Sequence, residues 1–161
     1  MARQDFESNS PTVTVDAPVL SEGDWDACTI LDPRRDLNAC AAFAYPAARG
    51  ANGRAAARVA DGLGYAWQGN LDRAIEAFDS AIRTAPGLSV AYLNRGLAYQ
   101  SKGDLRRALA DLDRAIANEP SSARGYYHRS RLYRSKGDTA RADKDAKRAI
   151  EIDPGYQAVL P

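Results

Sequence analysis

Residues 89–120 read SVAYLNRGLAYQSKGDLRRALADLDRAIANEP. This stretch contains two segments in which apolar residues recur at the spacing of an amphipathic helix. Lys102, Gly103 and Asp104 join the two segments, and Pro120 closes the second. A glycine followed by a capping side chain is typical of one helix ending and the next beginning, and proline stops a helix. The stretch therefore predicts a pair of helices joined by a tight turn.

The same layout recurs one period earlier and one period later along the chain. Five columns of residues keep a spacing of 34: Pro86, Pro120 and Pro154; Gly69, Gly103 and Gly137; Ala74, Ala108 and Ala142; Ala81, Ala115 and Ala149; Tyr65, Tyr99 and Tyr133. Internal repeats of this length indicate a helical solenoid. We expect paired helices at 55–68 and 71–84, at 89–102 and 105–118, and at 123–136 and 139–152.

The residue types in these columns carry a family resemblance. In the central repeat they run as an aromatic residue, a small residue, a Tyr, then Ala, a large apolar residue, Ala and Pro: Tyr92, Gly96, Tyr99, Ala108, Leu112, Ala115 and Pro120. This order resembles the tetratricopeptide repeat (TPR), and the resemblance covers roughly residues 55–156, about two thirds of the chain. Ala146 stands where Phe78 and Leu112 stand in the other repeats, so we expect the third repeat to pack less tightly than the second.

The resemblance implies an all-α fold, a right-handed TPR superhelix with three full repeats of 34 residues. We expect an extended or disordered arm at 1–20, a degenerate helical hairpin at 21–50, repeats at 55–88, 89–122 and 123–156, and a tail at 157–161. Within the hairpin, capping side chains at 21–24 precede a helix at 25–31, and Pro33 starts a second helix at 34–44. We expect this hairpin to stack on the first full repeat.

Two cysteines, Cys28 and Cys40, fall one on each of the two hairpin helices. A tight helical turn can bring them within bridging distance, and a disulfide would then contribute roughly 2–4 kcal/mol on the chain-entropy account. The residues alone leave a second interpretation open, in which both are small buried side chains. The pattern DWDAC at 24–28, DP at 32–33 and Cys40 resembles the N-terminal hairpin of exported bacterial TPR proteins. That resemblance implies that the two cysteines pair.

Charge and hydropathy argue against several classes of partner. The chain carries 22 Lys and Arg against 21 Asp and Glu, a formal net charge of +1. Binders of nucleic acid or membrane surfaces usually show a basic surplus, so we expect neither partner. No apolar run is long enough to span a bilayer. The start MARQDFESNS lacks the features of a secretory signal, which predicts a cytoplasmic protein, or a periplasmic one whose export segment is missing from this sequence.

Candidate catalytic groups are poorly placed for chemistry. The single histidine, His128, and the nearby Ser130 point to different faces of one helix, and a nucleophile needs a positioned base. The residues at 50–53 lack the Lys and Ser/Thr of a phosphate-binding loop. Two cysteines and a distant histidine make no metal-ligand set. We therefore expect no enzymatic activity, no cofactor and no metal.

In a TPR superhelix the first helix of each pair lines a concave groove, so the resemblance implies a binding surface there. The groove residues that we expect to contact a partner are Val59, Leu63 and Trp67 of the first repeat, Leu93, Asn94 and Leu97 of the second, and Arg124, Tyr127, His128, Arg131 and Arg134 of the third. The groove thus has an apolar N-terminal half and a basic C-terminal half. Such a surface suits a protein or peptide with an apolar anchor and acidic residues beside it.

TPR domains of chaperone partners bind a C-terminal acidic peptide through a carboxylate clamp. The clamp uses Lys and Asn in the first repeat, Asn in the second, and Lys and Arg in the third. Asn94 matches the second-repeat Asn, and Arg124 and His128 occupy the two third-repeat positions. Val59 and Leu63 replace the first-repeat pair. Most of the anion site is therefore absent or altered, and we do not expect a clamp of this type.

We interpret the chain as a non-catalytic scaffold that captures a peptide or helix in the groove. The alternative is a homo-oligomerising structural module that uses the repeat edges. Residues 155–161 are too short for the capping helix that usually ends a solenoid. Either the third repeat caps itself with small and charged residues, or Ile150, Ile152 and Tyr156 mediate self-association.

Overall fold

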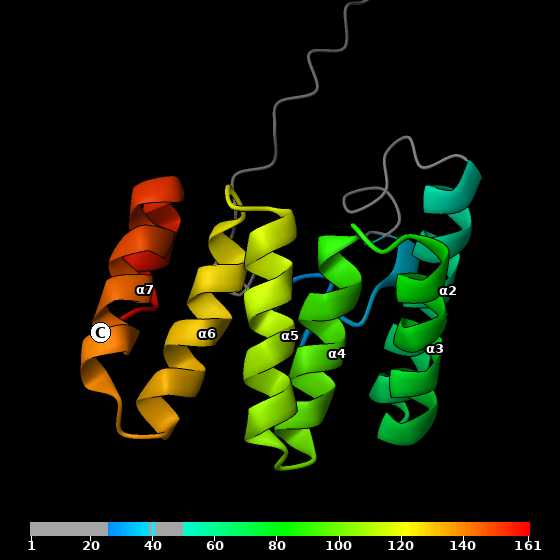
Figure 1. Cartoon of the computed structure of the whole chain (residues 1–161), viewed down its shortest axis with the longest axis horizontal. Helices are drawn as coiled ribbons and strands as arrows, with labels where there is room; N and C mark the ends of the chain where they lie inside the picture. Colours follow the sequence, from blue (N-terminus) through cyan, green and yellow to red (C-terminus); the bar gives the residue numbers. More distant parts are fainter. Residues whose placement is uncertain (1–25, 39, 41–49) are drawn as a thin grey trace, which may run out of the picture.

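The computed structural model describes residues 26–38, 40 and 50–161, and the elements in these ranges are helical, with no strand. The helices are α2 (Gly50–Trp67), α3 (Leu71–Thr84), α4 (Ser89–Ser101), α5 (Leu105–Asn118), α6 (Ala123–Ser135), α7 (Thr139–Ile152) and the short 3-10 helix η2 (Pro154–Ala158). The all-α solenoid is confirmed: the helices stand side by side in chain order, with α2 and α3 at one end and α7 at the other (Figure 1). The first helix begins at Gly50 rather than at residue 55.

The turn inside each helix pair repeats one set of hydrogen bonds. The side chains of Asn70, Asp104 and Asp138 accept from the backbone N–H three residues later, at 3.2, 2.9 and 3.1 Å. The preceding glycines, of which Gly103 is the central one, have φ between 78° and 82°, a conformation that side chains strongly disfavour. The glycine ends one helix and the polar residue caps the next, as the spacing predicted.

Small residues let the two helices of a pair lie close together. Ala74, Ala108 and Ala142 are fully buried between the helices. A Cβ on Gly62 would lie 2.3 Å from the ring of Phe78, so α2 and α3 touch at a position that only glycine fits. The second helix of each pair also packs on the first helix of the next, α3 on α4 and α5 on α6. Each repeat is therefore held by its neighbours in sequence.

The chain after α7 folds back onto the third repeat. The ring of Tyr156, on η2, lies 5.1 Å from that of Tyr127, and both are buried together with Ala146 and Leu160. Two tyrosines thus occupy the space beside Ala146. Residues 155–161 cover part of this edge although they form no capping helix, and Tyr156, expected as a self-association residue, is buried.

Ion pairs join neighbouring repeats through a second periodic set. Arg95 on α4 bridges Asp79 on α3 (2.7 Å) and Asp111 on α5 (2.7 Å). One repeat later, Arg129 on α6 bridges Asp113 on α5 and Asp145 on α7, at 2.8 and 2.7 Å. Each arginine thus links the second helix of one repeat to both helices of the next.

The predicted N-terminal hairpin differs most from the structure. Asp26 has 3-10 conformation and residues 27–31 form turns rather than a helix; among the described residues of the predicted hairpin, α-helical conformation appears at Leu37, Asn38 and Cys40. The segment passes behind α4 and α5 (Figure 1), and it also contacts α2 of the first repeat through Thr29 and Arg35, which both bond to Trp67. The expected arm at 1–20 and residues 39 and 41–44 of the second hairpin helix lie outside the described residues. None of the described helices is long and apolar enough to cross a membrane.

Candidate functional site

The groove predicted from the first helices of the repeats contains the chain's own N-terminal segment. We use this name for residues 26–38 and 40. It touches side chains of α2, α4 and α6 in turn, so it crosses all three repeats on the side that these helices line. Its residues run from the third repeat toward the first as the sequence advances from 26 to 30.

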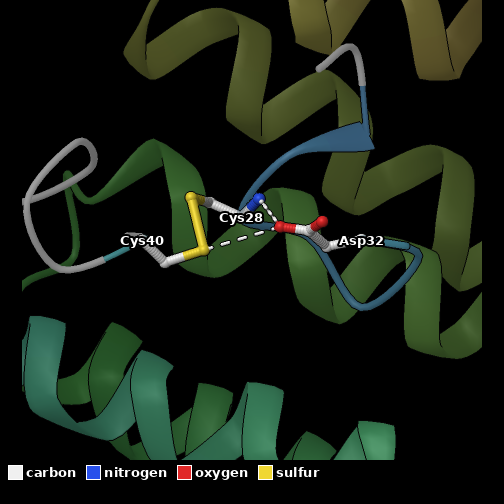
Figure 2. Close-up of side chains that lie close together, drawn as sticks. All are labelled: Cys28, Asp32 and Cys40. Carbon is white, nitrogen blue, oxygen red and sulfur yellow. Dashed lines mark hydrogen bonds between the residues drawn. A yellow bond between two sulfur atoms is a disulfide. The ribbon is translucent and has the colours of Figure 1, made fainter. Parts of the chain in front are cut away.

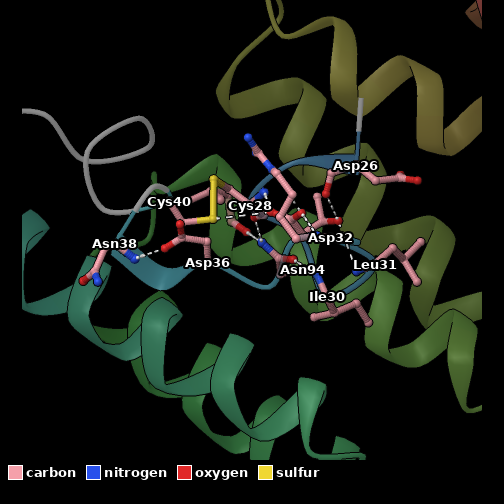
Figure 3. Close-up of a disulfide and its surroundings, with 12 residues drawn as sticks. Asp26, Cys28, Ile30, Leu31, Asp32, Asp36, Asn38, Cys40 and Asn94 are labelled. Carbon is pink, nitrogen blue, oxygen red and sulfur yellow. Dashed lines mark hydrogen bonds and ion pairs between the residues drawn. A yellow bond between two sulfur atoms is a disulfide. The ribbon is translucent and has the colours of Figure 1, made fainter. Parts of the chain in front are cut away.

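At the centre of the groove, Asn94 on α4 holds the backbone of the N-terminal segment. Its Oδ1 accepts a hydrogen bond from the N–H of Ile30 at 2.9 Å, and its Nδ2 donates to the carbonyl oxygen of Cys28 at 3.4 Å (Figure 3). Nδ2 also donates to the carbonyl of Val90 on its own helix at 3.1 Å, which fixes the orientation of the amide. Asn94 is fully buried, and its polar atoms are satisfied by these contacts.

At the first-repeat end, the groove receives an aliphatic side chain. Ile30 belongs to the same buried cluster as Val59, Leu63 and Leu97. Beside it, Nε1 of Trp67 donates a hydrogen bond to the carbonyl oxygen of Thr29 at 3.2 Å. Trp67 therefore binds backbone as well as covering the end of the groove.

At the third-repeat end, the groove receives a carboxylate. Oδ1 of Asp26 lies 3.5 Å from Nε2 of His128, and burial raises the pKa of Asp26. Arg131 and Arg124 act in the opposite direction, because their positive charges favour the ionised carboxylate. Burial lowers the pKa of His128 to about 3, with a smaller contribution from the two arginines, so the imidazole is uncharged at neutral pH.

A disulfide closes the N-terminal segment into a loop. Cys28 and Cys40 are bonded, as the resemblance implied, and their exposed fractions are only 2% and 1%. The buried carboxylate of Asp32 lies inside the loop: it accepts from the N–H of Cys28 at 2.7 Å and from the N–H of Arg34 at 2.9 Å, and the sulfur of Cys40 is 3.7 Å away (Figure 2). These bonds hold Cys28 in a left-handed conformation, with φ 58°.

The expected groove residues divide into two sets. Seven are buried, and an inner wall open to a partner is therefore not what the structure holds: Val59, Leu63, Leu93, Asn94, Leu97, Tyr127 and His128. Trp67 and Arg124 are partly exposed and Arg131 is exposed, all three at the border of the N-terminal segment. Arg134 pairs instead with Asp143 on α7 at 2.8 Å.

Sequence reasoning missed the residues that fill the groove, chiefly Asp26 and Ile30. The expected ligand was a polypeptide with an apolar anchor and an acidic residue beside it, and this chain contains such a segment. The signal in the sequence was this chain's own pair of an acidic and an aliphatic residue, Asp26 and Ile30. Searching the chain for the pattern expected of a ligand could have found the segment.

The described residues offer little chemistry. Cys28, Asp32 and Cys40 have ligand-type atoms within 4.8 Å of one another, but the two sulfurs are bonded together and so present no thiolates to a metal. The hydroxyl of Ser130 donates to the carbonyl of Tyr127 at 2.9 Å and is not activated by His128.

Comparisons with known proteins agree with the fold. The family model of the tetratricopeptide repeat matches residues 93–156. No curated protein matches the chain. Among solved structures, the first TPR domain of human RPAP3 is similar, with 25% identity and a TM-score of 0.64 over 69% of this chain and 89% of that one.

Two further similar structures contain TPR domains with bound peptides. The first TPR of Spaghetti (RPAP3), bound to the HSP90 peptide SRMEEVD, has 25% identity and a TM-score of 0.63 over 67% of this chain and 90% of that one. The second TPR domain of human RPAP3, in complex with the HSP70 peptide SGPTIEEVD, has 24% identity and a TM-score of 0.61 over 66% and 88%.

Proposed function

Residues 93–156 belong to the tetratricopeptide repeat family, and we propose that the chain is a non-catalytic protein-interaction module whose groove holds a short, non-helical polypeptide segment. The observation that carries this proposal is the double hydrogen bond between the carboxamide of Asn94 and the backbone of residues 28 and 30. A carboxamide that accepts from one peptide N–H and donates to a nearby carbonyl recognises polypeptide whatever its side chains are. The groove is thus equipped to bind a chain, and its own chain occupies it.

The charges of the groove support a ligand with an acidic side chain. Burial raises the pKa of Asp26, and Arg131 and Arg124 lie near its carboxylate and offset part of this effect by favouring the charged form. At the other end, Val59 and Leu63 are apolar and receive the side chain of Ile30. A partner would match these two ends with one acidic and one aliphatic residue.

The similar RPAP3 domains bind peptides that end in EEVD. In this groove, three positions that would bind a terminal carboxylate carry uncharged side chains, at Val59, Leu63 and His128. With the N-terminal segment in place, burial lowers the pKa of His128 to about 3, so its imidazole is uncharged at neutral pH. Val59 and Leu63 are fully buried among apolar side chains. We therefore propose an internal segment of a partner as the ligand, not a chain terminus.

The buried disulfide supports an oxidising compartment, because such bonds persist there and are rare where glutathione keeps thiols reduced. This favours the periplasmic alternative over the cytoplasmic one. A thiol count on the native protein, with and without reductant, tests this assignment. Two free thiols in the native protein would contradict it.

The proposal is tested with a displayed library of random peptides presented to the full chain carrying Cys28→Ser/Cys40→Ser and Ile30→Asp, changes chosen to release the N-terminal segment from the groove. We expect enriched peptides whose affinity falls at least tenfold when Asn94→Ala is added. Asn118→Ala, at an exposed asparagine on α5, is the matched control and should leave affinity unchanged. Failure to enrich any peptide, or equal binding by the Asn94→Ala variant, would exclude the groove as the binding site.

A further inference from the structure

We propose that residues 26–32 are the resident ligand of the groove, and that the Cys28–Cys40 disulfide is a latch that keeps this ligand bound and other polypeptides out. The proposal rests on the proposed function, since it assigns both the ligand pattern and the control of the same site. Its partner is a polypeptide segment that copies the contacts of the resident ligand.

The contacts define the pattern that a partner must present. Three features are read in order: a carboxylate at the position of Asp26, backbone groups on either side of Thr29, and an aliphatic side chain at the position of Ile30. A fourth feature is conformational. Cys28 has φ 58°, a region that glycine and asparagine enter more easily than other residues. Ala27 and Thr29 are also buried, so the positions that they occupy admit only small side chains. The pattern is therefore acidic, small, Gly or Asn, small, then Ile or Val.

The latch acts by keeping the resident ligand in its bound shape. The disulfide ties residue 28 to residue 40, and Asp32 bonds the N–H of Cys28 inside the loop. A partner peptide has no such closure and must fix its own backbone when it binds. The resident ligand is also tethered to α2, and a tether of this kind corresponds to an effective concentration of the order of millimolar. Together, closure and tether favour the resident ligand over a free peptide of the same sequence.

Opening the latch requires a dithiol reductant. The reductant supplies two electrons and two protons: the bond between the sulfurs of Cys28 and Cys40 breaks, each sulfur becomes a thiol, and the two reductant thiols become a disulfide. Attack needs access to a sulfur, and both sulfurs are almost completely buried while the segment is bound. Release of the segment from the groove therefore precedes reduction, and the rate of reduction reports how often the groove opens.

The first experiment measures competition with a fluorescent peptide, DWDAGTILDPR, which is residues 24–34 with Gly in place of Cys28. Full-length chains are compared in three forms: the oxidised protein, Cys28→Ser/Cys40→Ser, and the same pair with Ile30→Asp. We expect binding at least 100-fold tighter to the third form than to the first, with the second between them. A peptide with Asp in place of Ile30 should bind the third form at least tenfold more weakly. A peptide with an L-residue other than Asn at position 28 should bind the third form about 5- to 30-fold more weakly than the peptide with Gly there.

The second experiment works on the latched chain and needs no peptide. Excess dithiothreitol is added to the folded oxidised protein, and thiol release is followed. We expect Asn94→Ala to speed reduction at least tenfold, because it removes two contacts that hold the segment, while Asn118→Ala leaves the rate unchanged. Equal rates in the wild type and Asn94→Ala would overturn the latch.

The outcomes separate the inference from the function on which it rests. Equal binding of the peptide to the oxidised and released chains would contradict the assignment of residues 26–32 as the resident ligand. It would leave the proposed groove binding intact. No binding of this peptide to the released form, when library peptides bind it through Asn94, would overturn the ligand pattern alone. Absence of any Asn94-dependent ligand would overturn both.

Discussion

The repeats and the N-terminal segment are ordered in opposite ways. In the repeats, most contacts join helices that are neighbours in the chain, and the same capping bonds and buried alanines recur in each copy. In the N-terminal segment, the decisive hydrogen bonds to Asn94 cross 64 and 66 residues of sequence, and a disulfide holds the loop. The contacts that order the repeats lie mainly within and between neighbouring repeats, whereas the contacts that order the segment are made with helices far away in sequence. Changes in the two regions should therefore have different consequences.

The largest effect is expected from the core of the repeats. Leu112 is fully buried between α4 and α5. Leu112→Ala removes apolar contacts and leaves a cavity, so we expect a loss of about 2–5 kcal/mol in the free energy of unfolding. Thermal unfolding followed by helical circular dichroism measures it.

The control for this prediction is Leu31→Ala in the N-terminal segment, where the side chain is 42% exposed. We expect its effect on the stability of the helices to stay within about 0.5 kcal/mol. Similar losses for the two variants would show that the segment is part of the cooperative core.

The next effect is expected from the disulfide, and it should be local. Cys28→Ser/Cys40→Ser removes a closure worth roughly 2–4 kcal/mol on the chain-entropy account. We expect faster hydrogen exchange at the amide of Ile30 with little change in the helical signal, because no helix of the repeats contains either cysteine. A matching loss of protection in α5 would contradict the separation of the two regions.

A smaller effect is expected from acid, and it acts where the two regions meet. The pKa of His128 is about 3 in the folded protein and near 6.5 when unfolded, so the unfolded chain binds a proton that the folded one does not between these values. Stability should fall as the pH is lowered through this window, by about 1.4 kcal/mol per pH unit below 6.5. The raised pKa of Asp26 acts in the opposite sense in the acidic part of the window, because the folded form then binds the extra proton.

Denaturant titrations at pH 7.0, 6.0 and 5.0 measure this slope. Arg124 and Arg131, the charged groups that face His128 beside Asp26, stay charged throughout. His128→Gln removes the titrating group and should flatten the profile above pH 5. An unchanged slope in that variant would assign the acid sensitivity to other groups.

The sequence predicted the repeats because their order is local and periodic. The spacing of Gly103, Ala108 and Pro120 from their equivalents predicted helices whose ends lie within one residue of the observed ones, except at the start of α2. The same reasoning failed for residues 26–31, which carry helix-compatible residues after capping side chains. There, a bond from Asp32 to the N–H of Cys28 and the pairing with Asn94 outweigh helical propensity, and neither is visible in local sequence.

For the groove, the periodicity predicted which residues share a face but not what covers them. The apolar half at Val59 and Leu63 and the basic half at Arg124 and Arg131 follow from the sequence. What lies against them is a segment that is distant in the chain and has no periodic pattern of its own. To predict contacts of this kind, one must know which distant regions pair with each other. A single sequence shows only the residue pattern of each region.

The smallest effect is expected from the ion pairs that link the repeats. Arg95 donates from Nε and Nη2 to both oxygens of Asp111, and from Nη1 to Asp79. Arg95→Lys keeps the charge but loses the planar fork, so we expect a loss of about 0.5–1 kcal/mol in the free energy of unfolding. Arg148→Lys, at an exposed pair with Glu151 within one helix, is the matched control and should give no measurable change.

Combining substitutions then sharpens the comparison between the two regions. Arg129 shares no partner with Arg95, so the effects of Arg95→Lys and Arg129→Lys should add to within about 0.3–0.5 kcal/mol. Asn94→Ala and Cys28→Ser/Cys40→Ser act on one bound segment, and once either has released it the other has little left to remove. Their effects on hydrogen exchange at Ile30 should therefore be far from additive. Two results would contradict the comparison. One is additive effects of Asn94→Ala and Cys28→Ser/Cys40→Ser on hydrogen exchange at Ile30, and the other is strong coupling between Arg95→Lys and Arg129→Lys.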